Sequence, residues 1–198
     1  HIFTDVDGVY TTDPRICSKA KRLDLLTYEE MLEMSGLGSK VLQLRSVEFA
    51  SKYNVPIRVL DAHKNNALGT LITKEEKKME GAIISGIAFT KDEAEIMIKG
   101  VKDQPGVAAK ILGPIGTAKI EIDMIVQNVG SNGLADFTFT VSRNTLKNAI
   151  KVIENNKKSM GYSSFDTKNN IVKVSLIGVG MRSHAGIASK MFKCLAKN

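Results

Sequence analysis

The sequence predicts an α+β protein in which small modules of strands and helices follow an α/β segment. Two observations lead to this fold class. In the first part of the chain, β-rich stretches are separated by helical ones, as in α/β units. After a charged connector, a block of strand, glycine loop and helix occurs twice at a spacing of about 80 residues, which indicates repeated modules.

The composition is that of an ordinary globular protein, with 43% hydrophobic and 25% charged residues in 198. The net charge of +7 raises the question of nucleic-acid binding. The lysines are scattered, however, and the densest cluster, residues 74–78, also contains Glu75 and Glu76. Aromatic residues make up only 6% and Trp is absent. Nucleic-acid binding therefore remains a distant third hypothesis, and we expect no nucleic-acid partner.

Cysteine usage and hydropathy predict a cytoplasmic protein. Cys17 and Cys194 lie far apart in no metal-like spacing, which is typical of reduced thiols and gives no expectation of a metal site. No apolar run approaches the roughly 20 residues of a membrane span, and no signal peptide is visible. The first residues, His1-Ile2-Phe3, lack Met and read as part of a strand, and a helical pattern runs up to Asn198. We expect both ends to be cuts through a larger protein.

The first segment predicts an α/β unit with a capped helix. Thr27 followed by Glu30 is a capping-box pattern that starts a helix ending near Met34. Glycines at 36 and 38 interrupt it, and a second helix is expected over residues 39–53. Strands are expected at residues 2–9, 55–60 and 69–72, with a polar loop at 10–15.

Residues 73–80 form a charged connector, and the pattern changes after it. We expect Pro114 to kink or end the first helix of the following module, because its ring clashes with the carbonyl four residues earlier. The expected strands are 82–89, 94–101, 120–129 and 137–141, and the expected helices begin near Ala108 and Asn144.

The internal repeat is the most informative feature. Residues 96–101 resemble 174–179, and residues 106–112 resemble 186–192. The first copy reads βαββα, most of a ferredoxin-like βαββαβ unit. The second copy stops after its first helix, which leaves its sheet edge unpaired. We therefore expect either further residues beyond Asn198, or completion of the sheet by strand 82–89 and a partner chain.

The loop before the first repeated helix has the chemistry of a small-anion site. Asp103-Gln104-Pro105-Gly106 is a glycine-containing turn that opens a helix, so backbone N–H groups are free to donate. The helix dipole adds partial positive charge there. This combination suits a carboxylate such as that of an amino acid.

Several stretches resemble aspartate kinases along almost the whole chain. One is Gly38-Ser39-Lys40-Val41-Leu42, which matches the family's Gly-Ala-Lys-Val-Leu motif with Ser in place of Ala. The others are residues 4–15, 54–59, 86–89, 123–128, 136–140 and 178–186. The resemblance implies a C-terminal remnant of an amino-acid-kinase domain at 1–76, a first ACT module at 81–165 and the start of a second ACT module at 166–198. Strand 81–90 is expected to be shared between the two modules.

The resemblance implies an ATP site, with Mg²⁺, in the first segment. Thr4, Asp5 and Tyr10 match residues that bind the adenosine end of ATP. Asp13, Pro14 and Arg15 continue that loop, and Lys40 matches a lysine that reaches the phosphates. A compact ammonium at a glycine-flanked helix start suits a phosphate.

The resemblance also implies a lysine- or threonine-binding effector site in the first module. The matching residues are Asp103, Gly106, Val107, Ala108, Gln127, Asn128 and Thr138. N–H groups near Gly106 would take the effector carboxylate and Asp103 its ammonium, while Gln127 both donates and accepts. Asp123 and Asp136 are supporting candidates. In the second module the matching loop is 181–186. His184 lies in this loop, and a role in packing is favoured for it over a role in binding.

Three parts of the family pattern are absent from the sequence: the Lys-x-Gly-Gly-Thr/Ser motif, the aspartate-binding part and the Ile-Ser-Thr-Ser-Glu strand expected after Asn198. We therefore assign no catalytic residue to this chain and expect it to be inactive alone. The leading hypothesis is a fragment of ATP:L-aspartate phosphotransferase that self-associates as a homodimer or higher oligomer. The alternative is a non-catalytic regulatory subunit, which residues 1–72 argue against because such a subunit needs no nucleotide loop.

Overall fold

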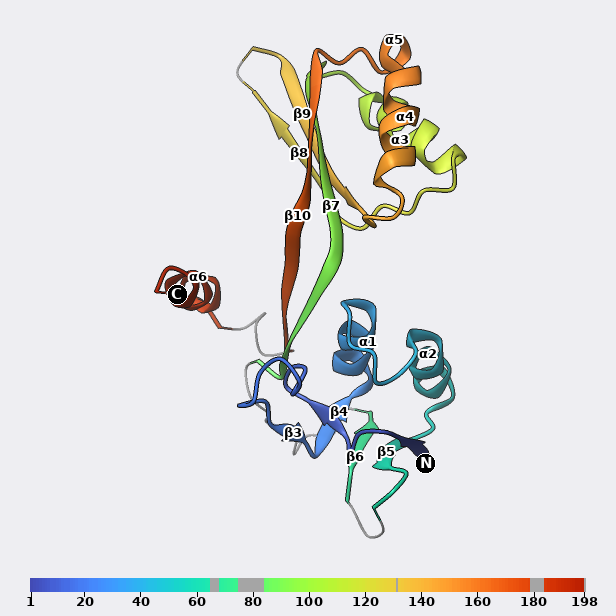
Figure 1. The fold of residues 1–198 in the computed structure, drawn as a ribbon, viewed down its shortest axis with the longest axis vertical. Coiled ribbons are helices and arrows are strands. Elements are labelled where there is room, and N and C mark those ends of the chain that lie inside the picture. The colour runs from blue at the N-terminus through green and yellow to red at the C-terminus, as the bar shows by residue number, and fades with distance from the viewer. Residues whose placement is uncertain (65–67, 75–83, 131, 179–183, 198) are drawn as a thin grey trace. The chain divides into compact units, whose positions relative to one another are not determined.

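The computed structural model describes residues 1–64, 68–74, 84–130, 132–178 and 184–197. The chain forms two compact units (Figure 1). The first comprises His1–Phe89 together with Val174–Asn198, and the second comprises Thr90–Lys173. Most of the connector at 73–80 and the first residues of the 181–186 loop lie outside the described residues.

The first unit is built on a mixed four-stranded sheet in the order β1-β5-β6-β4. Strand β5 pairs parallel with β1 and antiparallel with β6, and β4 pairs parallel with β6. The strands are β1 (Ile2–Thr4), β4 (Leu25–Thr27), β5 (Ile57–Asp61) and β6 (Thr70–Thr73). A separate antiparallel pair consists of β2 (Val9–Tyr10) and β3 (Arg22–Leu23).

Helix α1 (Tyr28–Gly36) confirms the predicted capping box. The Thr27 hydroxyl accepts from the Glu30 N–H at 3.1 Å, and the Thr27 N–H donates to the Glu30 carboxylate at 3.0 Å. The buried side chains of α1 and of α2 (Leu44–Tyr53) share one core with the sheet, which includes Leu26, Met31, Val47, Val59 and Ile72.

The predicted start of the second helix at residue 39 is wrong, because α2 begins at Leu44. Gly38 has φ of 119°, and Gln43 is the extended residue that precedes the first helical turn. Lys40 therefore lies before the helix and not at its start. The dipole argument that supported Lys40 as a phosphate ligand does not apply, although its exposed ammonium is still accessible.

The second unit has a four-stranded sheet in the order β10-β7-β9-β8, with helices on one face (Figure 1). Its strands are β7 (Gly86–Lys102), β8 (Ile125–Val129), β9 (Leu134–Val141) and β10 (Ser164–Ile177). Its helices are α3 (Val107–Thr117), α4 (Leu146–Asn155) and the short α5 (Lys157–Met160). Its core includes Ile96, Ile98, Ile111, Ile115, Phe137, Phe139 and Ile153.

This element order is a ferredoxin-like βαββαβ module, as the sequence pattern indicated. Strand β10 supplies the sixth element, which the sequence pattern had assigned partly to the second repeat. The two strands expected at 82–89 and 94–101 are joined in one strand, β7, which begins at Gly86, while residues 82 and 83 lie outside the described residues. Its central polar residues remain extended because their groups find partners: the Asp92 carboxylate accepts from the Ser142 hydroxyl at 2.8 Å and from the Arg143 N–H at 3.2 Å.

Helix α3 does not end at Pro114, one of the two outcomes expected there, since it continues to Thr117. A proline removes only its own N–H and disturbs the carbonyl one turn earlier. Here it lies in the last turn, and the Pro114 carbonyl accepts from the Ala118 N–H at 3.1 Å.

The internal repeat is confirmed in backbone conformation. Gly106, before α3, has φ and ψ of 86° and 1°, and Gly186, before α6 (Ile187–Leu195), has 90° and 0°. Each glycine carbonyl accepts the N–H of the lysine four residues later, at 3.1 Å for Lys110 and 3.0 Å for Lys190. Both loops thus enter their helices by the same left-handed turn, which favours glycine.

Candidate functional site

The loop of residues 103–106, called here the glycine loop, lies directly after β7 and directly before α3. The Asp103 N–H donates to the Gly133 carbonyl at 2.9 Å, and the Val107 N–H donates to the Gln104 carbonyl at 3.1 Å. Apart from its two chain neighbours, no residue has an atom within 4 Å of where a Cβ on Gly106 would stand. The helix start is therefore open on this side and has no side-chain cap of its own.

Gln127 and Asp103 meet across the module, with the Gln127 amide donating to the Asp103 carboxylate at 3.4 Å. Gln127 pairs in register with Phe137, whose side chain is buried in the core beside α3. Paired residues of antiparallel strands point to the same face. Gln127 is therefore on the helix-bearing face, near the glycine loop, and both polar side chains are exposed.

The structure does not bring all the predicted effector residues together. Asn128 pairs with Asp136 and Val126 pairs with Thr138, so Asn128 and Thr138 face away from the helices. Val107 is buried and contributes packing, while Ala108 is half-buried on the first turn of α3. Within one module, the candidate site thus comprises Asp103, Gly106, Ala108 and Gln127.

The two supporting carboxylates have structural partners. Asp136 accepts from the Gly100 N–H at 2.9 Å, beside an irregularity in β7. Asp123 pairs with the Lys173 ammonium, which also lies 3.5 Å from the Glu93 carboxylate. The Glu93 and Lys173 side chains are only 8% and 12% exposed. Sequence reasoning missed this pair, because it left Glu93 between two separate expected strands.

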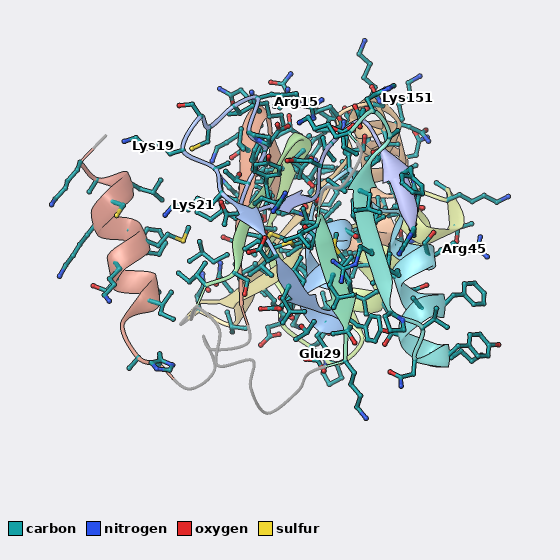
Figure 2. All side chains as sticks on the ribbon, turned by 90° about the horizontal axis from the view of Figure 1, so that it is seen from below. Arg15, Lys19, Lys21, Glu29, Arg45 and Lys151 are labelled. Carbon is teal, nitrogen blue, oxygen red and sulfur yellow. The ribbon has the colours of Figure 1, made fainter. Side chains whose placement is uncertain are left out.

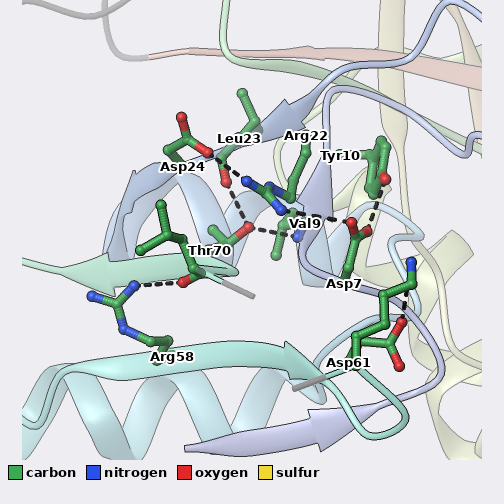
Figure 3. Close-up of polar contacts among 11 residues, drawn as sticks. Asp7, Val9, Tyr10, Arg22, Leu23, Asp24, Arg58, Asp61 and Thr70 are labelled. Carbon is green, nitrogen blue, oxygen red and sulfur yellow. Dashed lines mark hydrogen bonds and ion pairs between the residues drawn. The ribbon is translucent and has the colours of Figure 1, made fainter. Parts of the chain in front are cut away.

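Residues 4–15, called here the nucleotide segment after the role that the family resemblance predicts for them, contain an ordered set of polar contacts in the first unit. The Thr4 hydroxyl donates to Asp5 at 3.0 Å, and the Tyr10 hydroxyl donates to the Asp7 carboxylate at 2.8 Å (Figure 3). That hydrogen bond is the main reason why the pKa of Tyr10 lies above its ordinary value. The Arg22 guanidinium lies 3.6 Å from the other carboxylate oxygen of Asp7 and forms an ion pair with it.

Asp13 and Arg15 form the turn that follows Tyr10. The Asp13 carboxylate accepts from the Arg15 N–H at 2.9 Å and from its guanidinium at 3.0 Å. The Arg15 hydrogen bonds lower the pKa of Asp13, and the nearby Lys40 charge adds to the effect. Pro14 lies exposed between them.

Sequence reasoning missed the residues that hold this segment. Thr70 accepts from the Val9 N–H at 2.7 Å and donates to the Leu23 carbonyl at 2.5 Å, which ties β2 and β3 to β6 (Figure 3). Basic side chains continue along the exposed loop between β2 and β3, where Figure 2 labels Arg15, Lys19 and Lys21. A run of exposed cations suits a polyphosphate ligand.

Among the described residues, no group of three or more His, Cys, Asp and Glu side chains is placed to hold a metal ion. None of their helices is long and apolar enough to cross a membrane.

Sequence comparison matches both parts of the chain. Residues 1–61 match the amino acid kinase family, and residues 95–157 and 174–198 each match the ACT domain. The aspartate kinase Ask_LysC of Stutzerimonas stutzeri (strain A1501) is 61% identical over 197 residues, covering 99% of this chain and 48% of that protein. The chain therefore spans about half the length of the curated relatives it matches.

Solved structures give the same result. A chain from the crystal structure of aspartokinase alpha and beta subunits is 46% identical, with a TM-score of 0.54 and coverage of 58% of this chain and 74% of that one. The aspartate kinase of Clostridium acetobutylicum, described as an allosteric enzyme, is 26% identical with a TM-score of 0.85, covering 99% of this chain and 45% of that one.

Fold and site together define a segment of an amino acid kinase joined to ACT domains. The chain belongs to the aspartate kinase family.

Proposed function

We propose that this chain is the C-terminal part of an aspartate kinase, which transfers the γ-phosphoryl group of ATP to the β-carboxylate of L-aspartate. The observation that carries the proposal is the match to an aspartate kinase at 61% identity over 99% of the chain. Catalysis of phosphoryl transfer rests mainly on positioning and charge stabilisation. The chain's role in it is to hold ATP, and catalytic residues are assigned to the part of the relatives that this chain does not span.

The nucleotide segment is proposed to contact ATP, bound with Mg²⁺. Tyr10 is held by Asp7 and offers a ring beside the adenosine end. Arg15 and Lys40 supply positive charge for the phosphates, with Arg15 oriented by Asp13. Mg²⁺ characteristically bridges phosphate oxygens and keeps several waters, so ATP itself supplies much of its coordination.

The first ACT module is proposed to bind an amino-acid effector, lysine or threonine, at the glycine loop. Backbone N–H groups at the start of α3 would donate to its carboxylate, and Asp103 would accept from its ammonium. Gln127 already contacts Asp103 and would fix its orientation. Such a site does no chemistry and acts by shifting a conformational equilibrium.

A second copy of the chain is the proposed partner. Strand β8 lies at the sheet edge, and Ile125, Val126 and Val129 on it are exposed. An exposed apolar edge strand is a template for pairing with another chain. A second copy would also allow Asn128 and Thr138, on the far face of one module, to contribute to an effector site at the contact. We place the protein in the cytoplasm.

A non-catalytic regulatory subunit is the second candidate. The similarity to a chain of an aspartokinase with alpha and beta subunits favours this candidate, because the match covers 74% of that chain. The match of residues 1–61 to the amino acid kinase family and the ordered contacts of the nucleotide segment favour the catalytic parent.

Calorimetric titration of the full-length protein with ATP, lysine, threonine and methionine separates these candidates. The proposal predicts binding of ATP and of at least lysine or threonine. Effector binding without ATP binding would support the regulatory subunit. Absence of binding for all three amino acids would contradict the effector site.

A further inference from the structure

Strand β7 begins with a hydrogen bond to the nucleotide segment. The Ile87 N–H donates to the Thr11 carbonyl at 2.7 Å. Thr11 lies between Tyr10 and Asp13, and its other polar groups are also engaged: its N–H donates to the Lys21 carbonyl at 2.9 Å, and its hydroxyl accepts from the Lys21 N–H at 3.1 Å. The backbone of the segment is thus fixed at Thr11 from the β2–β3 loop on one side and from β7 on the other.

The backbone of β7 at Gly86 also lies close to Thr11. A Cβ on Gly86 would overlap with the terminal methyl group of Met34 and would lie 3.1 Å from the Thr11 carbonyl oxygen. Gly86 does not have positive φ, so the requirement is for space and not for an unusual backbone conformation. Met34 is buried, and therefore the backbone of β7 lies directly between the α1 core and the nucleotide segment.

Ser85, directly before β7, forms hydrogen bonds with two further elements. Its N–H donates to the Ile177 carbonyl at the end of β10 at 2.7 Å, and its hydroxyl donates to the Glu30 carboxylate in the capping box of α1. Ser85 and Glu30 are each 8% exposed and Ile177 is fully buried. The first residues of β7 therefore cannot move without changing contacts to α1, β10 and Thr11.

We propose that Gly86 and Ile87 are positioning residues for the nucleotide segment. This inference rests on the proposed function, since it deepens the ATP site proposed there. The Ile87 N–H holds the Thr11 carbonyl, and the missing side chain of Gly86 leaves room for this close approach. Loss of either feature displaces the backbone between Tyr10 and Asp13 and so lowers the affinity for ATP.

The test uses the full-length enzyme with Ile87→Pro, which removes the N–H donor, and Ile87→Ala, which keeps it. The Ile87 side chain is exposed at 42%, so the Ala variant controls for its loss. We expect Ile87→Pro to weaken ATP binding in calorimetry roughly 3- to 10-fold, the range for one hydrogen bond. KM for ATP rises with it and KM for aspartate stays the same. Equal ATP affinity in both variants would overturn the positioning role.

Gly86→Ala keeps the inference testable if the proline variant does not fold. Gly113→Ala is the matched control, because no atom lies within 4 Å of where its Cβ would stand. Weaker ATP binding in Gly86→Ala but not in Gly113→Ala supports the role. A second addition, Met34→Ala, removes the side-chain overlap. Full recovery of ATP affinity in that double variant would assign the effect to Met34 and overturn the contact with Thr11.

These are binding measurements, so they remain decisive if the protein proves not to phosphorylate aspartate. Conversely, an active enzyme with indifferent variants refutes the inference and leaves the function standing.

Discussion

The amide of Gln127 donates to the carboxylate of Asp103 at 3.4 Å, joining edge strand β8 to the loop that follows β7. The two residues are exposed and lie beside the open start of α3. This pair presents an acceptor for an ammonium next to N–H donors for a carboxylate, the two charged groups that every free amino acid carries.

Replacing Asp103 should weaken feedback inhibition and leave uninhibited turnover nearly unchanged. Asp103→Ala removes the acceptor for the effector ammonium, a loss of about 1.5–3 kcal/mol for a hydrogen bond to a charged group. Effector affinity then falls roughly 10- to 150-fold. Inhibition curves for lysine and threonine on the full-length enzyme measure this, with the exposed Glu121→Ala as control. Wild-type inhibition by both amino acids in a folded Asp103→Ala variant would remove the site from consideration.

Lys173→Met should destabilise the ACT module strongly. It leaves the Glu93 carboxylate, 8% exposed, without its charge partner. Breaking a buried pair in this way costs about 3–5 kcal/mol. Urea denaturation measures the loss. Lys168→Met is the control, since its ion pair with Glu95 is largely exposed on the lysine side and is worth less than about 1 kcal/mol.

The double variant Lys173→Met with Glu93→Gln checks the cause. It removes the unpaired charge and should recover part of the lost stability, because a neutral amide costs less to bury than a carboxylate. If the double variant is no more stable than Lys173→Met, the loss comes from packing and not from charge.

The Asp13 carboxyl should titrate below its usual range. Because folding lowers its pKa, the stability that it contributes is complete above the unfolded pKa of about 3.9 and is lost as pH falls through the lower folded-state value. Arg15→Gln removes the main cause, so the Asp13 pKa should rise towards normal. Carboxyl-carbon NMR titration of both proteins measures this. The same Asp13 pKa in wild type and Arg15→Gln would contradict the assigned cause.

Local signals predicted part of the fold well. The capping box of Thr27 and Glu30 depends on contacts three residues apart, so the sequence shows it directly. The repeat of Gly106 and Gly186 was also visible, because both helices begin with the same left-handed turn that favours glycine. The proximity of Asp103 and Gln127 followed from family resemblance, since nothing in a single sequence places residue 127 beside residue 103.

Long-range pairing explains the failures. The polar stretch at residues 90–93 looks like a loop in isolation, yet pairing in the sheet and the contacts of Asp92 and Glu93 keep β7 extended. The division of effector residues between two faces depends on the register of β8 and β9, which alternation within one strand does not fix. The contact of Ile87 with Thr11 has no sequence signal, because it joins two backbones.

The decisive measurement is formation of aspartyl phosphate from ATP and aspartate, by the full-length enzyme and by residues 1–198 alone. We expect the full-length enzyme to form the product, lysine or threonine to inhibit it, and residues 1–198 alone to form none above background. Product formation by residues 1–198 alone, or none by the full-length enzyme, would contradict this expectation.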